Sequence, residues 1–279
     1  MRFEVWQNFR RSKLAIVAVA YVALITAVAV AAPLLSPYAP NEANLTDRLQ
    51  PPSSRHLLGT DDLGRDVLAR MIHGSRVSLV VGYSATVLSL IIGSFLGALA
   101  GYYGGVADWI VSRLIEIVLC FPFLFLVLGI VALFKPSLYS ILVALALTSW
   151  TTEARFVRAE FLRIRELDYA QAARASGARD PRIIFRHLLP NALAPVIVSA
   201  SFGVASAILI ESALSFLGFG VALPTSSWGS ILAVAQEFVS YAWWLVVFPG
   251  TAIFLTVAAF NLIGDRLRDV LDPRGDPVL

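Results

Sequence analysis

Residues 79–100 read LVVGYSATVLSLIIGSFLGALA and contain no charged side chain. As an α-helix this run would be about 33 Å long, enough to cross a hydrocarbon core about 30 Å thick. Only helices and closed barrels satisfy their backbone polar groups in lipid, and the run shows no alternation of period two. Five further apolar runs also lack that alternation: residues 14–35, 117–134, 138–152, 192–217 and 238–264. The sequence therefore predicts an all-α, polytopic membrane protein with six transmembrane helices.

The composition indicates the same environment. Of 279 residues, 58% are apolar and 15% are charged, whereas a soluble domain has about 45–50% and about 25%. Cys120 is the only cysteine and the three histidines are scattered, so we expect neither a disulfide framework nor a metal site. The net charge is +3, and we assign the excess of basic residues to the cytoplasmic face of a membrane. The expected partner is therefore a lipid bilayer, and we do not expect the protein to bind nucleic acid. Residues 14–35 exceed the core of about 7–15 residues in a signal peptide, which predicts a retained first helix.

The basic residues predict the orientation of the spans. With the N-terminus inside, the 22 Lys and Arg residues divide 16 to 6 between the cytoplasmic and the external segments. Cytoplasmic segments of membrane proteins carry such an excess of positive charge. We therefore expect a multi-pass protein with both termini in the cytoplasm.

The external connection, residues 36–76, ends in an amphipathic stretch. Leu63, Val67 and Met71 fall on one helical stripe, which predicts a helix along the membrane surface or on another helix. The chain then divides into residues 1–76, an N-terminal transmembrane helix with its external loop, and residues 77–279, a five-helix core.

The cytoplasmic connection, about residues 153–191, carries a defined pattern. Asp168 and Gln171 have the spacing of a capping box, which predicts a short helix from Asp168. Gly177 predicts the end of that helix at a positive φ. Asp180 and Pro181 predict the N-cap and first turn of a second helix, which should stop before Pro190. The expected product is a helix, a glycine corner and a helix that another protein can bind; a solvated basic loop is the alternative.

Two features lie within the predicted spans. Gly93, Gly97 and Gly101 recur every four residues on one helix face, which predicts a close helix crossing. This crossing is either a static packing seam or a surface that slides during gating. Glu211 is the only ionisable residue well inside a span, and with Ser215 it is a candidate for the substrate path. A charge inside a membrane faces protein or water, so Glu211 either contacts the amino group of a peptide or pairs with a neighbouring helix.

The cytoplasmic connection resembles a known family. Gln171-Ala172-Ala173, three residues, Gly177, nine residues and His187-Leu188-Leu189-Pro190 resemble the EAA loop of binding-protein-dependent ABC importer permeases. Gln171 stands where the general pattern has Glu, and His187 where it often has an aliphatic residue. Four further stretches are similar to the dipeptide/oligopeptide/nickel branch of DppC/OppC type: residues 56–66, 211–220, 227–229 and 261–274. The resemblance covers nearly the whole chain.

The resemblance implies the fold of a type I (MetI-like) ABC importer permease and a division of labour. A second homologous permease, in a heterodimer, two cytoplasmic ATPases and an external substrate-binding protein would complete an importer in the cytoplasmic membrane of a bacterium or archaeon. The chain has no phosphate loop followed by Lys and Ser/Thr, so it is not expected to be an enzyme, and ATP and Mg²⁺ belong to the ATPase. The loop would contact that ATPase through the following residues: Asp168, Gln171, Ala172, Ala173, Gly177, Asp180, Pro181, Leu189 and Pro190.

The solute stays open at this point. Di- or oligopeptides are favoured, and nickel chelates or other small solutes are alternatives within the same family. A self-sufficient secondary carrier or channel that uses Glu211 as an ion or proton site is the rival from another class. A receptor or scaffolding membrane protein has only the amphipathic external segment in its favour.

Overall fold

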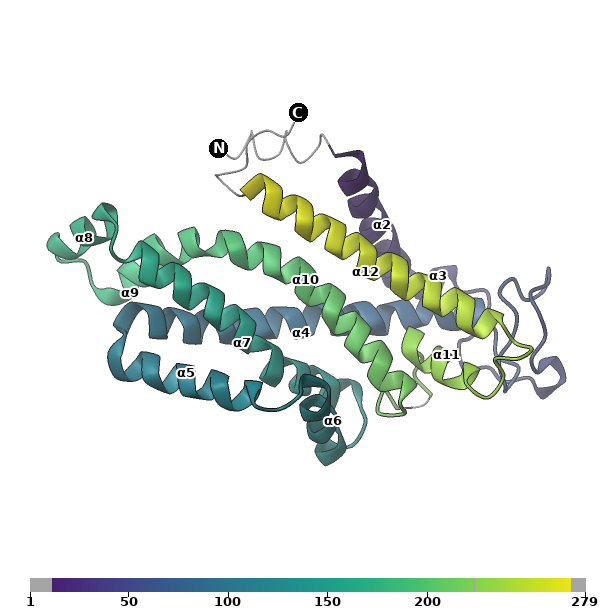
Figure 1. Ribbon diagram of the computed structural model, residues 1–279. Helices are drawn as coiled ribbons and strands as arrows, with labels where there is room; N and C mark the ends of the chain where they lie inside the picture. The colour runs from purple at the N-terminus through teal and green to yellow at the C-terminus, as the bar shows by residue number, and fades with distance from the viewer. Residues whose placement is uncertain (1–11, 223, 272–279) are drawn as a thin grey trace.

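The computed structural model describes residues 12–222 and 224–271, and these residues form an elongated helical bundle (Figure 1). No strand occurs in the described ranges, and Thr60 and Asp66 form one isolated antiparallel bridge. The α-helices are α2 (Lys13–Val30), α3 (Ala32–Leu35), α4 (Val67–Tyr103), α5 (Gly105–Leu119), α6 (Phe123–Phe134), α7 (Leu138–Ile164), α8 (Asp168–Ala175), α9 (Asp180–Arg182), α10 (Leu189–Phe216), α11 (Trp228–Ala235) and α12 (Trp244–Leu271). A 3-10 turn, η1 (Leu45–Asp47), and a π-helical segment, η2 (Ile183–Leu188), complete the chain path. The all-α prediction is confirmed.

The structure does not confirm all six predicted spans. Within the described residues, α2, α4, α10 and α12 contain stretches long and apolar enough to cross a membrane, and the bent pair of α5 and α6 would make a fifth. The predicted span 138–152 is the first half of α7, whose second half carries five charged side chains: Glu153, Arg155, Arg158, Glu160 and Arg163. Helix α7 has 27 residues and is long enough to cross a membrane, but only its first half is apolar.

A proline divides the predicted span 117–134. Helix α5 ends at Leu119 and α6 begins at Phe123, after Pro122, with an angle of 88° between them. Proline has no N–H to donate, and its ring collides with the preceding helical turn. The predicted span 117–134 is therefore divided between two differently directed helices, which together make one bent span or a re-entrant loop.

The amphipathic stretch does not form a helix of its own. Residues 61–66 form a turn, and Val67 begins α4, which continues without a break to Tyr103. Asp66 caps the helix because its Oδ1 accepts a hydrogen bond from the Ala69 N–H at 2.8 Å. The 37 residues of α4 extend over about 55 Å, more than a hydrocarbon core needs.

The glycine stripe of α4 lies against α7. A Cβ atom added to Gly93 would lie 2.5 Å from the Glu153 Cβ, and one on Gly101 would lie 2.5 Å from the Phe161 Cβ. A Cβ on Gly97 would lie 2.5 Å from the Ala154 carbonyl oxygen. The two helices therefore approach more closely than any side chain at these three positions would allow.

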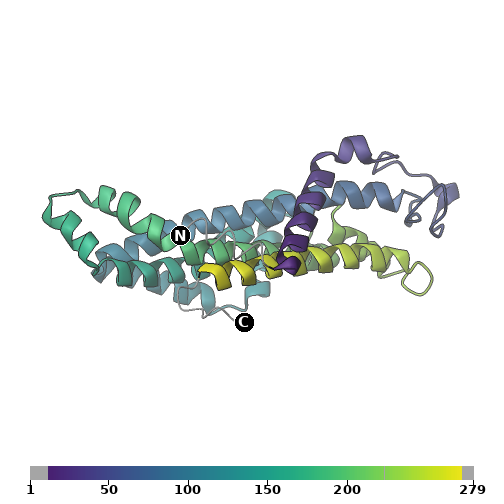
Figure 2. The same cartoon turned by 90° about the horizontal axis from the view of Figure 1, so that it is seen from above.

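The two long connections occupy opposite ends of the bundle. Figures 1 and 2 show α8 and α9 at one end, and residues 36–66 together with α11 at the other. Trp244 at the start of α12 holds the first connection, residues 36–66, because its Nε1 donates a hydrogen bond to the Thr60 carbonyl at 3.0 Å. Helix α2 crosses the long helices obliquely and meets α12 through the Tyr21 and Thr256 hydroxyls, 3.2 Å apart.

Candidate functional site

The first helix of the α8–α9 corner begins as predicted, but with a different cap. Asp168 is the first residue of α8, while Leu167 holds the N-cap position and makes no side-chain capping bond. Gln171 does not complete a capping box, because its Nε2 donates to the Glu166 carbonyl at 3.0 Å. The predicted capping box is therefore wrong: the N-cap is Leu167, one residue before Asp168, and no side chain caps the helix. A carboxylate in the first turn still interacts favourably with the helix dipole.

Gly177 ends α8 in the predicted left-handed conformation, with φ of +77°. The Gly177 N–H donates to the Arg174 carbonyl at 2.9 Å, and the Ala178 N–H donates to the Ala173 carbonyl at 3.1 Å. These two bonds form a Schellman motif, which satisfies the carbonyls at the end of the helix. Nothing lies within 4 Å of a Cβ built on Gly177, so the backbone conformation and not lack of space calls for glycine here.

The second half of the corner departs from the predicted path. Arg179 holds the N-cap position of α9 and Asp180 is its first residue, with Pro181 in the first turn. The helical conformation does not end before Pro190. It continues through the π-helical η2 into α10, and Pro190 lies in the first turn of α10. A wider π turn relieves the collision that a proline ring makes with the carbonyl four residues earlier. The corner is therefore joined to α10 without a flexible connection.

Tyr102 joins the corner to the end of α4, a contact that the sequence did not indicate. The Tyr102 hydroxyl donates a hydrogen bond to the Asp180 carboxylate at 2.7 Å. The Arg174 guanidinium lies over the Tyr102 ring, 5.1 Å from its centre, in a cation–π arrangement. One side chain of α4 thus contacts both halves of the corner.

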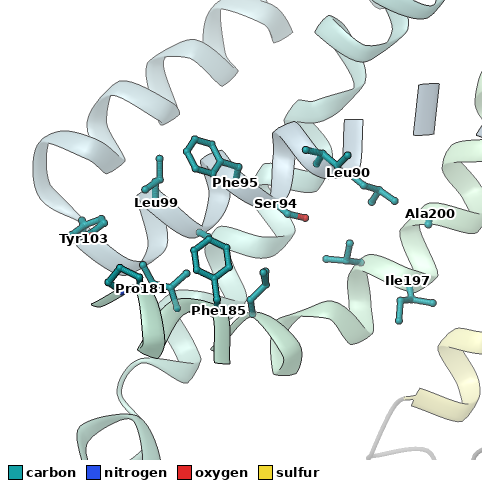
Figure 3. Close-up of a pocket in the computed structure, with 14 residues that line it drawn as sticks. Leu90, Ser94, Phe95, Leu99, Tyr103, Pro181, Phe185, Ile197 and Ala200 are labelled. Carbon is teal, nitrogen blue, oxygen red and sulfur yellow. The ribbon is translucent and has the colours of Figure 1, made fainter. Parts of the chain in front are cut away.

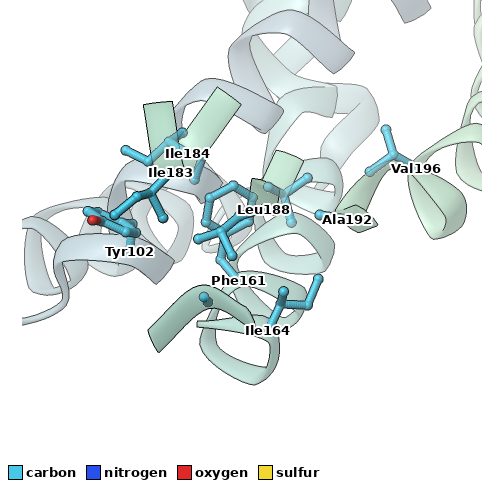
Figure 4. Packing of buried hydrophobic residues seen from close by; sticks show 11 residues of the cluster. Tyr102, Phe161, Ile164, Ile183, Ile184, Leu188, Ala192 and Val196 are labelled. Carbon is cyan, nitrogen blue, oxygen red and sulfur yellow. The ribbon is translucent and has the colours of Figure 1, made fainter. Parts of the chain in front are cut away.

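A buried hydrophobic cluster anchors the corner to the long helices (Figure 4). Ala170 of α8 and Leu188 of η2 are fully buried in it, together with Phe161 and Ile164 of α7. The opposite face is open, because the side chains of Gln171 and Ala172 are exposed. Leu189 is half-buried where α10 begins. The corner therefore has one face packed on α4, α7 and α10 and one face of small and polar residues toward solvent.

An apolar groove of about 640 Å³ runs beside the corner, between α4 and α10 (Figure 3). Phe95 and Leu99 of α4, Phe185 of η2 and Ile197 of α10 contribute to its wall. Ser94 and Tyr103 supply the only hydroxyl groups among the lining residues. Such a lining suits lipid or an apolar helix face and not a polar solute.

A second, larger cavity of about 1210 Å³ lies between the long helices. Helices α4, α5, α6, α7, α10 and α12 all contribute to its wall. Its lining contains four charged residues, which are Glu153, Glu160, Arg163 and Arg268, and a set of hydroxyl groups: Thr86, Ser89, Thr148, Ser149, Thr151, Thr152, Ser199 and Ser206. A concave, largely uncharged lining with a few polar groups is typical of a small-molecule site.

Glu211 and Ser215 line neither of these two cavities. Glu211 is fully buried, and its two carboxylate oxygens accept hydrogen bonds from Ser215 at 2.7 Å and from Ser78 of α4 at 3.1 Å. The Ser215 hydroxyl lies 3.3 Å from that of Ser227, which precedes α11. These four residues form a polar contact that joins α10 to α4 and to the start of α11.

Two known protein families match most of the chain. Residues 93–276 match the family described as "Binding-protein-dependent transport system inner membrane component", and residues 3–52 match the "N-terminal TM domain of oligopeptide transport permease C". The chain belongs to this family of permeases. The permease is accordingly a transport component, and the ATPase of such importers is a separate subunit.

Two curated relatives are each 44% identical to the permease. It is 44% identical over 271 residues to the dipeptide transport system permease protein DppC of Alkalihalophilus pseudofirmus, covering 97% of this chain and 89% of that protein. It is also 44% identical over 277 residues to the di/tripeptide transport system permease protein DppC of Pseudomonas aeruginosa, covering 97% and 91%.

A solved structure shares the fold of the permease. The MetNI methionine ABC transporter in inward-facing conformations matches with a TM-score of 0.56 at 20% identity, covering 71% of this chain and 95% of that one. The expected MetI-like fold is confirmed.

Proposed function

We propose that the permease forms one half of the membrane pathway of an ATP-driven importer of di- or oligopeptides. The names of its relatives, at 44% identity over nearly their whole length, support peptides over nickel chelates and other small solutes. The complete importer contains a second homologous permease, two cytoplasmic ATPases that bind ATP and Mg²⁺, and an external substrate-binding protein. It lies in the cytoplasmic membrane of a bacterium or archaeon, with both termini of this chain in the cytoplasm.

The α8–α9 corner is the coupling element in this proposal. The observation that carries it is the corner's two-sided construction: small exposed residues on one face and the buried cluster around Phe161 and Leu188 on the other. An ATPase that holds the exposed face and then closes would displace the corner as a body. Because the buried face packs on α4, α7 and α10, these helices would follow, which is a rigid-body transition of the kind used in alternating access.

Glu211 is assigned a packing role in the same proposal. Its carboxylate accepts hydrogen bonds from Ser78 and Ser215 and lies away from the large cavity. A secondary carrier that uses Glu211 as its ion site would need a path from that carboxylate to water. Purified permease in vesicles should therefore move no peptide without the ATPase, whereas ATP-independent uptake would favour the carrier.

A pair of proline variants tests the coupling role. Gly177 and Gly218 both have positive φ, both donate their N–H to the carbonyl three residues earlier, and both have open space around a Cβ. Proline fixes φ near −65° and removes the N–H, so each variant disrupts one turn. Gly177→Pro should still insert in the membrane but lose the ATPase subunits on purification and lose ATP-driven import.

Gly218→Pro is the matched control, because it disrupts the same kind of turn after α10. It should retain the ATPase subunits. Retention of the ATPases by Gly177→Pro at the wild-type ratio, with import unchanged, would rule out the corner as the coupling element.

A further inference from the structure

Glu153 holds a carboxylate at the wall of the large cavity, near the middle of α7. Fifteen residues separate it from Leu138 and eleven from Ile164, so it lies about 22 Å and about 17 Å along the helix from the two ends. The residue as a whole is only 6% exposed. Gly93 of α4 packs against its Cβ, which fixes the position of the side chain at its base.

The carboxylate of Glu153 has no cationic partner among the described residues. Oε2 accepts a hydrogen bond from the Ser199 hydroxyl of α10 at 2.5 Å, and Oε1 accepts none from the described part of the chain. A buried carboxylate is costly unless a cation or further hydrogen bonds balance it. One oxygen of this carboxylate at the cavity wall thus has no hydrogen-bond partner among the described residues.

The arginines of α7 do not supply the missing charge. Arg158 makes two hydrogen bonds to Asp108 of α5, and Arg163 is bonded to Glu160 at 2.7 Å. Arg155 is exposed and lies two residues beyond Glu153, on the other side of the helix. Arg163 of α7 and Arg268 of α12 also line the cavity. Arg163 is about 15 Å farther along α7 than Glu153. Neither arginine forms an ion pair with Glu153 in the described residues.

The cavity wall is mostly apolar, and most of the polar groups set in it are uncharged hydroxyls. Ser89 of α4 and Thr151 of α7 are buried beside the cavity, and Thr86 has a buried hydroxyl without a hydrogen-bond partner in the described residues. Hydroxyls both donate and accept, so they suit a peptide backbone whatever its side chains are. The carboxylate adds one requirement for the solute, which is a positively charged group.

We propose that Glu153 binds the ammonium group of the solute while it crosses the cavity. The inference rests on the peptide import proposed above. Every unblocked peptide carries an α-ammonium group, which is largely protonated at neutral pH. A carboxylate that is half-satisfied by Ser199 and open on its other oxygen recognises that group without reading the side chains of the peptide. Glu153 would then be a specificity-determining residue of the pathway.

Import by the complete importer in vesicles tests this role. The rate of Ala-Ala import is measured with the peptide loaded on the binding protein. Glu153→Gln should lower this rate at least tenfold, and Glu153→Asp should import at no less than half of the wild-type rate. Glu116→Gln is the matched control, since Glu116 of α5 is exposed, pairs with Arg113 and does not line the cavity; it should import at the wild-type rate. Import by Glu153→Gln within twofold of wild type would overturn the inference. Failure of Glu153→Asp to restore import would do the same and would indicate a structural role.

A binding measurement separates the ammonium group from the rest of the peptide. The purified permease–ATPase complex, without binding protein, is melted with millimolar Ala-Ala or with lactyl-alanine, which has a hydroxyl in place of the amine. Ala-Ala should raise the melting temperature of wild type and of Glu153→Asp but not of Glu153→Gln, and lactyl-alanine should raise none. Equal shifts from the two probes, or none from Ala-Ala in wild type, would contradict the assignment. Absence of peptide import by the wild-type importer would instead remove the proposed function itself.

Discussion

At the residue scale, Asp66 shows how one side chain secures the start of a long helix. Its Oδ1 caps α4 through the Ala69 N–H, and its Oδ2 lies 2.9 Å from Nδ1 of the buried His56. Asp66→Ala removes both interactions and should lower the free energy of unfolding by about 1–3 kcal/mol. Thermal unfolding of the purified permease measures this loss. Asp66→Asn keeps an oxygen for the cap, so it should lose clearly less; equal losses for the two variants would show that the cap contributes nothing.

The sequence predicts single residues well where the backbone alone imposes the choice. Gly177 was expected at a positive φ, and its φ is +77°, because glycine adopts that region without a steric penalty. The contact between Tyr102 and Asp180 could not be predicted, since 78 residues separate them and only the packing of α4 on the corner brings them together. The position of Glu153 at a cavity wall depends on such packing in the same way.

At the element scale, the crossing of α4 and α7 depends on glycine. A Cβ on Gly97 would lie 2.5 Å from a backbone oxygen of α7, which cannot move away as a side chain can. Gly97→Ala should therefore destabilise the permease by about 1–3 kcal/mol. Gly129→Ala in α6 is the matched control: nothing lies within 4 Å of its Cβ, so the better helix former should be neutral or stabilising by up to about 1 kcal/mol. Thermal unfolding of both variants checks the two signs, and a harmless Gly97→Ala would contradict the close crossing.

Helices were predictable as elements, but their ends and directions were not. Apolar runs located α2, α4, α10 and α12 because burial in lipid requires such runs. The 88° turn at Pro122 was not predicted, since a proline within an apolar run is compatible with a kink as well as with a complete change of direction. Helix α7 extended past the predicted end at residue 152 because its charged second half finds partners, as Arg158 does in Asp108.

At the scale of the whole molecule, the proposed orientation places the two connections on opposite sides of the membrane. Labelling with a membrane-impermeant maleimide tests this in a Cys120→Ser background, because Cys120 is exposed and would react. Glu42→Cys in the first connection should label in intact cells, whereas Ser176→Cys in the corner should label only after permeabilisation. Both positions are exposed in the bundle, so accessibility in the protein itself is matched. The reverse pattern would invert the orientation and place the corner out of reach of a cytoplasmic ATPase.

The uninterrupted length of α4 has a geometric effect on any motion of the bundle. Its first turn is fixed at the Asp66 cap, and its last turn carries Tyr102 against the corner. Over about 55 Å, a tilt of only about 5° around the midpoint swings the two tips about 2.4 Å in opposite senses. A rigid helix of this length needs no relay of intermediate side chains, because a displacement of one end moves the other end through the same hydrogen-bonded backbone.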